Sequence, residues 1–347
     1  MEKVVVSVIV PIYNVKDFID RGINQMLSQS YQNFEVLLVD DGSTDGSFEE
    51  CKRWSDKDSR IVVLHQQNQG AGSARNLGIE HAKGNYIYFY DIDDEISPRL
   101  LEYNVQMMEK YAADMIVFGY TSTDVTYKSK VTVDFPQTHI QSNSQLRDVY
   151  VDEFVLKVNG FPWNKFYSKI FLDKHHLRFE NQRIQQDEVF NMLCYKHVDR
   201  MYISSEVLYN YYVYAKGNTR SRFIPDRFDI YKSVRQHFED LKGFWHLDDS
   251  RLNNYLCKRF YDSVISCMMF NLTHPKCAFS KQQKKMEMKR IMTDPLAIEA
   301  FAYADNADLG LEQYLYRRAC QNQNLWQIRL LVNSFSIFRN VYSKIRK

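Results

Sequence analysis

The first 120 residues alternate between short apolar runs and segments of helical period, and this alternation constrains the fold more than any other feature. The apolar runs lie at 4–10, 34–39, 61–64, 86–90 and 115–118, and the helical segments lie at 15–29, 46–55, 71–82 and 98–112. Strands that alternate with helices of this length are typical of βαβ units in a mostly parallel, doubly wound sheet. Ligands of such sheets bind beyond the carboxyl ends of the strands. We therefore predict an α/β fold with its site at that edge.

The alternation ends near residue 121. A hairpin is predicted at 124–135, short helices at 143–156 and 168–175, and strands at 200–204 and 207–214. Beyond Pro225 the period is helical through 226–244, 251–271, 280–293, 295–304, 308–320 and 323–346. A boundary near 222–226 predicts two domains, a Rossmann-like one at 1–222 and an all-helical one at 223–347.

Composition is that of a globular protein and excludes several classes. The chain is 45% hydrophobic and 25% charged, and its net charge of +2 gives no reason to expect a nucleic-acid partner. Its six cysteines show neither a CxxC pair nor metal-type spacing, so we expect ordinary thiols in a reducing compartment. No apolar run has the length of a spanning helix or of a signal-peptide core. We expect a cytoplasmic protein, soluble or peripheral on a membrane.

Three carboxylates follow the apolar run at 86–90, namely Asp91, Asp93 and Asp94. Clustered negative charge at a strand end needs compensation. Mg²⁺ or Mn²⁺ can supply it, because these ions bind one or two carboxylates together with the phosphates of a substrate. A solvated acidic turn is the alternative. Polar residues also follow the other strand ends, at 11–14, 40–43 and 66–68, so the sheet edge is predicted to be a site.

Residues 68–78 form a Gly-rich segment that leads into a helix. It lacks the Gly-Lys-Ser/Thr ending of a Walker loop and the acidic partner of a GxGxxG motif. Gly70 and Gly72 would allow close backbone approach, and Arg75 would supply a fixed cation for a phosphate or for a carboxylate of the acidic cluster. A helix cap with a solvated arginine is the alternative. Asp41, at another strand end, would accept the N3–H of a pyrimidine.

Four stretches carry a resemblance to a known family: SVIVPIYN at 7–14, VLLVDDGSTDGS at 36–47, NQGAGSARNLGIEHAKGNYIYFYDIDD at 68–94 and WNKFYSKIF at 163–171. They resemble family 2 glycosyltransferases of the GT-A fold, especially bacterial enzymes that build capsular polysaccharide, exopolysaccharide or wall polymers. The resemblance covers about residues 4–222. It implies an inverting hexosyl- or N-acetylhexosaminyltransferase that uses Mn²⁺ or Mg²⁺, a nucleotide-sugar donor such as a UDP-sugar, and a glycan acceptor linked to polyprenyl diphosphate.

The resemblance also implies roles for single residues. The donor pocket would be formed by Pro11, Tyr13, Asp41, Asn68, Arg75, Asp91 and Asp93. Asp91 and Asp93 match the Asp-x-Asp pair of metal-binding residues, with Asp93 the expected direct ligand and Asp91 the expected contact to ribose or to Arg75. Trp163 and Lys165 match a turn on the acceptor side, although Trp163 would fit the core equally well. Lys216 and Arg220 match a basic loop near the diphosphate, or a merely solvated loop.

The stretch from Gln186 to Phe190 matches the Glu-Asp-x-x-Phe motif that opens a helix in the family, and it implies that Asp187 is the general base. Gln186 stands where the motif has Glu, and Glu188 is a second candidate for the base. A helix start favours the charged form of a carboxylate, so burial against the sugar would have to restore its basicity. The alternative is that Asp187 only caps the helix at 188–197.

Beyond Glu312 the chain has no acidic residue, and its basic residues are Arg317, Arg318, Arg329, Arg339, Lys344, Arg346 and Lys347. Aromatic and aliphatic residues are interleaved with them. Such a basic amphipathic helix is typical of membrane interfaces, here the inner face of the plasma membrane. Packing on its own domain or on a second copy in a homodimer is the alternative.

Two other functions stay open on sequence alone. A catalytically silent homologue that binds sugar nucleotide or scaffolds an assembly complex would explain Gln186. A nucleotidyltransferase would need a Gly-rich basic loop after the first strand, where the chain has Pro11 to Asn14 instead.

Overall fold

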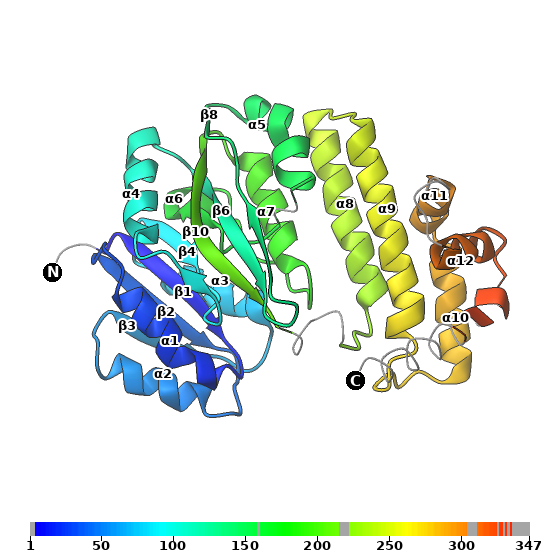
Figure 1. Ribbon diagram of the computed structural model, residues 1–347, viewed down its shortest axis with the longest axis horizontal. Coiled ribbons are helices and arrows are strands. Elements are labelled where there is room, and N and C mark those ends of the chain that lie inside the picture. Colours follow the sequence, from blue (N-terminus) through cyan, green and yellow to red (C-terminus); the bar gives the residue numbers. More distant parts are fainter. Residues whose placement is uncertain are drawn as a thin grey trace. The chain divides into compact units, whose positions relative to one another are not determined.

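The computed structural model describes residues 4–157, 160–214, 222–303, 311–324, 326–328, 330, 331 and 334 (Figure 1). The chain divides into two compact units, Met1–Lys216 and Gly217–Lys347. Each unit has a hydrophobic core of its own. The predicted domain boundary stays a prediction, because it adjoins residues 215–221, which lie outside the described part.

The first unit is built on one mixed sheet with the strand order β3-β2-β1-β4-β9-β6-β10-β5. Its strands are β1 (Val6–Ile12), β2 (Phe34–Asp40), β3 (Ile61–His65), β4 (Tyr86–Phe89), β5 (Glu95–Ile96), β6 (Met115–Asp124), β7 (Ser129–Val133), β8 (Thr138–Ile140), β9 (Lys165–Ser168) and β10 (Met201–Val213). The pairs β1–β2, β2–β3, β1–β4 and β6–β10 are parallel. β9 runs antiparallel between β4 and β6. The predicted α/β fold with a mostly parallel central sheet is confirmed.

Helices cover both faces of this sheet, as a doubly wound fold requires. They are α1 (Lys16–Leu27), α2 (Ser47–Ser55), α3 (Ala71–His81), α4 (Leu100–Tyr111), α5 (Asn143–Tyr150) with the π-helical turn η1 (Val151–Val155), α6 (Lys169–Lys174) and α7 (Gln186–His197). Alternate residues of β1, such as Val8 and Val10, belong to one core with Ile19 and Ile23 of α1. On the opposite face Ile9 packs so closely on Gly78 of α3 that a Cβ at residue 78 would lie 2.4 Å from it. Both faces of β1 are therefore buried, which explains its unbroken apolar run.

The two strands predicted at 200–204 and 207–214 form one strand, β10. Its register against β6 shifts between Ile203 and Tyr209, which identifies an irregularity of the β-bulge type. The Ser204 hydroxyl accepts a hydrogen bond from the Glu206 amide at 3.0 Å, so the polar residues close a local loop within the strand. The sequence pattern resembled a turn because bulges and turns use the same polar residues. The predicted hairpin at 124–135 is formed by the end of β6 and β7.

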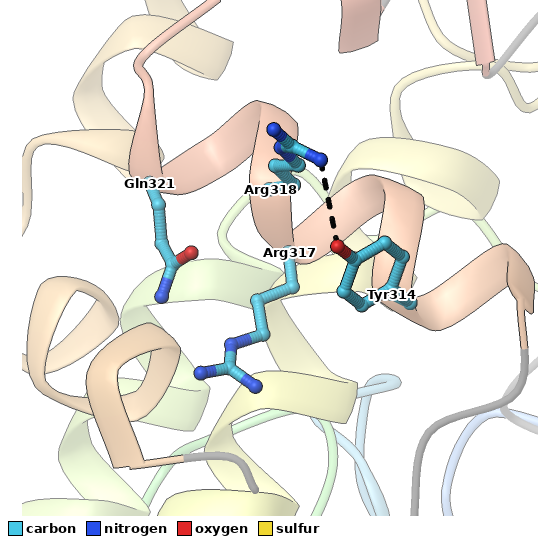
Figure 2. A pocket seen from close by; sticks show the side chains of 4 residues that line it. All are labelled: Tyr314, Arg317, Arg318 and Gln321. Atoms are coloured by element: carbon cyan, nitrogen blue, oxygen red, sulfur yellow. Dashed lines mark hydrogen bonds between the residues drawn. The ribbon is translucent and has the colours of Figure 1, made fainter. Parts of the chain in front are cut away.

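The regular secondary structure of the second unit, as far as it is described, consists of helices. Its helices are α8 (Arg227–Trp245), α9 (Ser250–Ser266) with the π-helical turn η3 (Cys267–Asn271), α10 (Lys281–Met292), α11 (Pro295–Tyr303) and α12 (Leu311–Gln321). A polar cavity of about 180 Å³ is lined by Tyr314, Arg317, Arg318 and Gln321 of α12 (Figure 2). The helix predicted at 323–346 lies mostly outside the described residues. Among those described, no helix has the length and apolar character needed to cross a bilayer.

Candidate active site

The acidic turn at 91–94 follows β4 directly, and its last carboxylate is not presented to solvent. The Asp94 side chain is 1% exposed. Its Oδ2 accepts a hydrogen bond from the Tyr209 hydroxyl at 2.6 Å, and its Oδ1 accepts one from the Tyr212 amide at 2.8 Å. Burial, together with Asp93 and Asp91, raises the pKa of Asp94 to about 9. Asp94 therefore ties the acidic turn to β10 and is not available to a ligand.

Asp91 and Asp93 are only partly buried, and they differ in how their charge is compensated. Asp91 accepts a hydrogen bond from the Arg75 guanidinium at 2.8 Å. The backbone carbonyl of Asp93 accepts hydrogen bonds from the Arg21 guanidinium and, at 3.4 Å, from the Tyr214 hydroxyl, whereas no described cation pairs with its carboxylate. Burial and the neighbouring Asp91 raise the pKa of Asp93 to about 6. The positive charge of Arg21 opposes this shift. Of the three carboxylates of the turn, that of Asp93 is the one with no hydrogen bond or ion pair to a described side chain.

This charge distribution fits a divalent cation bound with a diphosphate. In the described part of the chain, no three His, Cys, Asp or Glu side chains converge as a complete protein cage for a metal would require. Mg²⁺ does not need one, because it is usually bound through one or two carboxylates and completes its shell with substrate phosphates and water. A partly buried carboxylate whose pKa is raised by burial and by a neighbouring carboxylate is a group whose charge such an ion would stabilise.

Arg75 of α3 lies between the acidic turn and the predicted base. Its side chain is almost fully buried and its guanidinium lies 5.4 Å from the centre of the Phe179 ring, in addition to its ion pair with Asp91. Its positive charge also acts on Asp187, where it opposes the rise in pKa that burial causes. The buried Nε has no hydrogen-bond partner among the described residues. Arg75 therefore connects two carboxylates that are 96 residues apart in the sequence.

Asp187 lies in the first turn of α7, which approaches the first turn of α3. A Cβ at Gly72 would lie 3.1 Å from Cγ of Gln186 and 3.2 Å from Cβ of Phe179, so glycine is what allows this approach. Burial raises the pKa of Asp187 and Glu188 adds to the effect, while Arg75 opposes it. The Asp187 carboxylate accepts a hydrogen bond from the adjacent Glu188 amide at 3.0 Å. The structure thus brings Asp187, Arg75 and Asp91 together.

Glu188, the second candidate for the base, is oriented differently. A Cβ at Gly160 would lie 3.3 Å from both Cβ and Cγ of Glu188, so this side chain packs on the turn that begins at residue 160. Gln185, which precedes the helix in a left-handed conformation with φ of 59°, donates a long hydrogen bond of 3.5 Å to its carboxylate.

Asp41 anchors the Gly-rich loop. Its buried carboxylate accepts hydrogen bonds from the Gln66 side chain at 2.7 Å and from the amides of Gln69 and Gly70 at 2.8 Å each. Oδ2 accepts only the hydrogen bond from the Gly70 amide. This oxygen therefore retains a lone pair for a further donor. Asn68 lies exposed on the same loop. Because the loop and Asp41 come from neighbouring strand ends, they form one wall of the site.

The loop after β1 is joined to the loop after β2. The side-chain oxygen of Asn14 accepts a hydrogen bond from the Thr44 backbone amide at 2.8 Å. The backbone amide of Asn14 donates one to the Ser43 hydroxyl at 3.1 Å. Asn14 has a left-handed backbone with φ of 53°, a conformation that asparagine tolerates better than most residues. Pro11 is partly buried and Tyr13 is 44% exposed. An exposed aromatic ring on a braced loop is suited to stacking.

Trp163 and Lys165 are both buried in this structure. Trp163 is 2% exposed, and its ring is stacked on Tyr209 at 4.4 Å and on Phe161 at 4.6 Å, so aromatic neighbours cover it. Lys165 is fully buried, and its ammonium donates to the Phe161 carbonyl at 2.5 Å and to the Asn164 side chain at 2.8 Å. The burial of Trp163 fits the alternative that it belongs to the core, and Lys165 begins β9, which lies inside the sheet. A role of either residue on the acceptor side stays a prediction.

The two basic residues predicted to lie near the diphosphate, Lys216 and Arg220, lie outside the described residues.

Tyr211 of β10 was not predicted as a site residue. Burial and the carboxylates of four aspartates raise its pKa to about 12; these are Asp94, Asp91, Asp93 and Asp187. The sequence signal was the tyrosine-rich end of β10, YNYYVY at 209–214, which alternation identifies only as a strand.

Comparison with known proteins agrees with this geometry. The family described as glycosyl transferase family 2 matches residues 7–176. EpsJ, an uncharacterised glycosyltransferase of Bacillus subtilis, is 31% identical over 278 residues, which cover 78% of this chain and 80% of EpsJ. GlyG, a glycosyltransferase of Streptococcus pneumoniae, is 31% identical over 232 residues, which cover 65% of this chain and 70% of GlyG.

A solved structure has the same fold. Residues 1–349 of S. aureus TarS in complex with UDP-GlcNAc match with a TM-score of 0.62 and 18% identity, covering 96% of this chain and 91% of that one. This likeness establishes the fold, and the similarity to EpsJ and GlyG over most of their length establishes the family. The chain therefore belongs to glycosyl transferase family 2 and is a glycosyltransferase of the GT-A fold.

Proposed function

We propose that this glycosyltransferase is a metal-dependent, inverting enzyme that transfers a hexose or N-acetylhexosamine from a UDP-sugar to a hydroxyl of a glycan acceptor. The observation that carries the proposal is the position of Arg75, which is paired with Asp91 and acts on Asp187. An acidic pair suited to a cation–diphosphate complex and a carboxylate with a raised pKa thus share one site. The fold of TarS, which holds UDP-GlcNAc in its solved structure, supports a UDP-sugar as the donor.

On the donor side, the nucleotide would lie across the strand ends. The exposed ring of Tyr13, next to Pro11, is suited to stacking on a base, and the free lone pair of Asp41 is suited to accepting the uracil N3–H. Asn68 would contact the same end of the ligand. The orphaned Nε of Arg75 is a donor for ribose or phosphate oxygens. These contacts would fix the position of the anomeric carbon.

Asp93 would hold a divalent cation, with Asp91 beside it. When bound, Mg²⁺ or Mn²⁺ would stabilise the negative charge of the leaving diphosphate. The raised pKa of Asp93, caused by burial and by the neighbouring Asp91, supports this assignment, since a bound cation would stabilise the charged carboxylate. Lys216 and Arg220, beyond the described residues, are proposed to approach the same diphosphate.

Asp187 would act as general base. It accepts the proton of the acceptor hydroxyl as the oxygen of that hydroxyl bonds to the anomeric carbon, and the bond from this carbon to the diphosphate oxygen breaks. A base with a pKa nearer to neutral than that of an ordinary aspartate suits this step, and a positioned base is worth roughly 10²–10⁴-fold in rate. One base and a direct displacement imply inversion at the anomeric carbon.

The acceptor and the cellular setting are proposed from sequence. We assign the acceptor to glycans on polyprenyl diphosphate in surface polysaccharide synthesis, and the basic segment beyond residue 322 to the inner face of the plasma membrane. Flotation of the full-length protein with vesicles that contain anionic lipid tests the second assignment. Flotation with neutral vesicles is the control, and recovery only in the dense fraction with both would contradict it.

The test of the mechanism is Asp187→Asn, with Glu188→Gln as the matched variant. We expect Asp187→Asn to abolish UDP release in the presence of acceptor while UDP binding with Mn²⁺, measured by calorimetry, stays within about twofold of wild type. Preserved turnover in Asp187→Asn and loss in Glu188→Gln would move the role to Glu188. Turnover in excess EDTA would refute the metal requirement. Donor binding by wild type without UDP release for any acceptor would favour the catalytically silent alternative.

A further inference from the structure

Tyr211 of β10 is held rigidly at the edge of the site. Its ring is half-buried and packs on Trp163, with a ring-centre distance of 5.3 Å and an angle of 19° between the planes. It also lies 5.9 Å from the ring of Phe161. The next residue, Tyr212, donates its amide proton to Asp94 of the acidic turn. Both the ring and the backbone of Tyr211 are therefore fixed relative to that turn.

The Tyr211 hydroxyl forms no hydrogen bond with a described residue, and the side chain is partly exposed to solvent. Tyr209, two residues earlier on the same strand, differs because its hydroxyl donates to Asp94 at 2.6 Å. Four carboxylates act on the Tyr211 phenol; they belong to Asp94, Asp91, Asp93 and Asp187. The hydroxyl consequently lies within electrostatic range of both the acidic turn and the proposed base.

In the proposed mechanism the sugar of the donor lies between the acidic turn and the base, because it is bonded to the diphosphate on one side and attacked on the other. Carboxylates can only accept hydrogen bonds from sugar hydroxyls, and they leave the oxygens of the sugar without a donor. A phenol that stays protonated at neutral pH supplies one. Its ring is already ordered by stacking, so little entropy is lost when the hydrogen bond forms.

We infer that the Tyr211 hydroxyl donates a hydrogen bond to an oxygen of the transferred sugar, either a ring hydroxyl or the carbonyl of an N-acetyl group, and that Tyr211 determines specificity for that sugar. This inference rests on the proposed function and deepens it, because it concerns the sugar and not the nucleotide. It predicts that Tyr211 matters for a UDP-sugar and is irrelevant to UDP alone.

The test is Tyr211→Phe, with Tyr120→Phe as the matched control. Tyr120 packs on the same Trp163, at 4.9 Å, and its pKa is raised by burial with no contribution from a carboxylate. Each protein is titrated, with Mn²⁺ present, with UDP and with whichever of UDP-GlcNAc, UDP-GalNAc, UDP-glucose and UDP-galactose the wild type binds best. We expect Tyr211→Phe to weaken UDP-sugar binding about 3–10-fold with unchanged UDP binding, the range of one neutral hydrogen bond. Tyr120→Phe should change neither.

Three outcomes would overturn the inference. Wild-type affinity of Tyr211→Phe for both the UDP-sugar and UDP would refute it while leaving the proposed function intact. An equal loss of UDP and UDP-sugar binding would show that the phenol only supports the fold. A wild type that binds none of the four UDP-sugars would refute the proposed UDP-sugar donor and this inference together. In the supporting case, KM for the donor rises in Tyr211→Phe and the thermal midpoint of unfolding stays at the wild-type value.

Discussion

The ion pair between Arg75 and Asp91 should be the most strongly coupled charge pair of the site. The two groups are 2.8 Å apart, and their side chains are only 6% and 29% exposed. At that distance and an effective dielectric constant of about 20, the gross attraction is about 6 kcal/mol. Desolvation of the two charges offsets much of this attraction. Removal of one partner, however, leaves the other charge buried without a counter-charge, which lowers the free energy of unfolding by about 3 kcal/mol or more.

We therefore expect Arg75→Met to lower the free energy of unfolding at pH 7 by about 3 kcal/mol, because Asp91 is left beside Asp93 without a counter-charge. Asp91→Asn should lower it by about 2 kcal/mol. The double variant should lose about 3 kcal/mol and not 5, because neither unpaired charge remains. The resulting coupling energy of about 2 kcal/mol lies within the range for residues in one ion-pair network.

The assay is urea denaturation of the four proteins of this double-mutant cycle, in buffer with EDTA so that no metal compensates the carboxylates. The control cycle uses Arg99 and Glu206, an ion pair of 3.4 Å whose side chains are 63% and 42% exposed. Its coupling should stay below about 0.5 kcal/mol. If the Arg75–Asp91 coupling is no larger than that of the control pair, the reasoning from burial is refuted.

Three further outcomes are expected. Burial is the main cause of the raised pKa of Asp187. As the pH is lowered, kcat/KM should therefore start to fall, by tenfold per pH unit, at a higher pH than it would with an ordinary aspartate as base. A fall that starts only near the usual pKa of aspartate would contradict this. Gly72→Ala should lower kcat/KM about tenfold with the fold intact, because the added methyl group presses on Gln186 and Phe179 and would displace the start of α7, which carries Asp187. Wild-type kinetics would show that α7 can shift without displacing the base. Gly243→Ala in α8, where a Cβ meets nothing within 4 Å, should raise the free energy of unfolding by about 0.5 kcal/mol and leave kinetics unchanged. A destabilised Gly243→Ala would show that this glycine has a role in packing.

Local sequence was sufficient for the parts of this protein that depend on neighbours along the chain. Strands buried on both faces must be continuously apolar, so β1, β2 and β4 could be placed from the runs at 4–10, 34–39 and 86–90. A parallel sheet aligns the carboxyl ends of its strands, so Asp41 and Asp91 could be assigned to one edge. Arg75 was expected to hold a carboxylate of the acidic cluster or a phosphate, and the ion pair with Asp91 is present.

Pairing between distant strands decided the rest. β9 inserts between β4 and β6, which buries Trp163 and Lys165 where local pattern allowed an acceptor contact. The bulged strand β10 extends to the acidic turn, where it buries Asp94 and brings in Tyr211, a residue that strand alternation could not distinguish from its neighbours. Periodicity along a chain reports which residues are buried, whereas the partner against which each is buried depends on contacts between segments a hundred residues apart. Only the tertiary structure fixes those contacts.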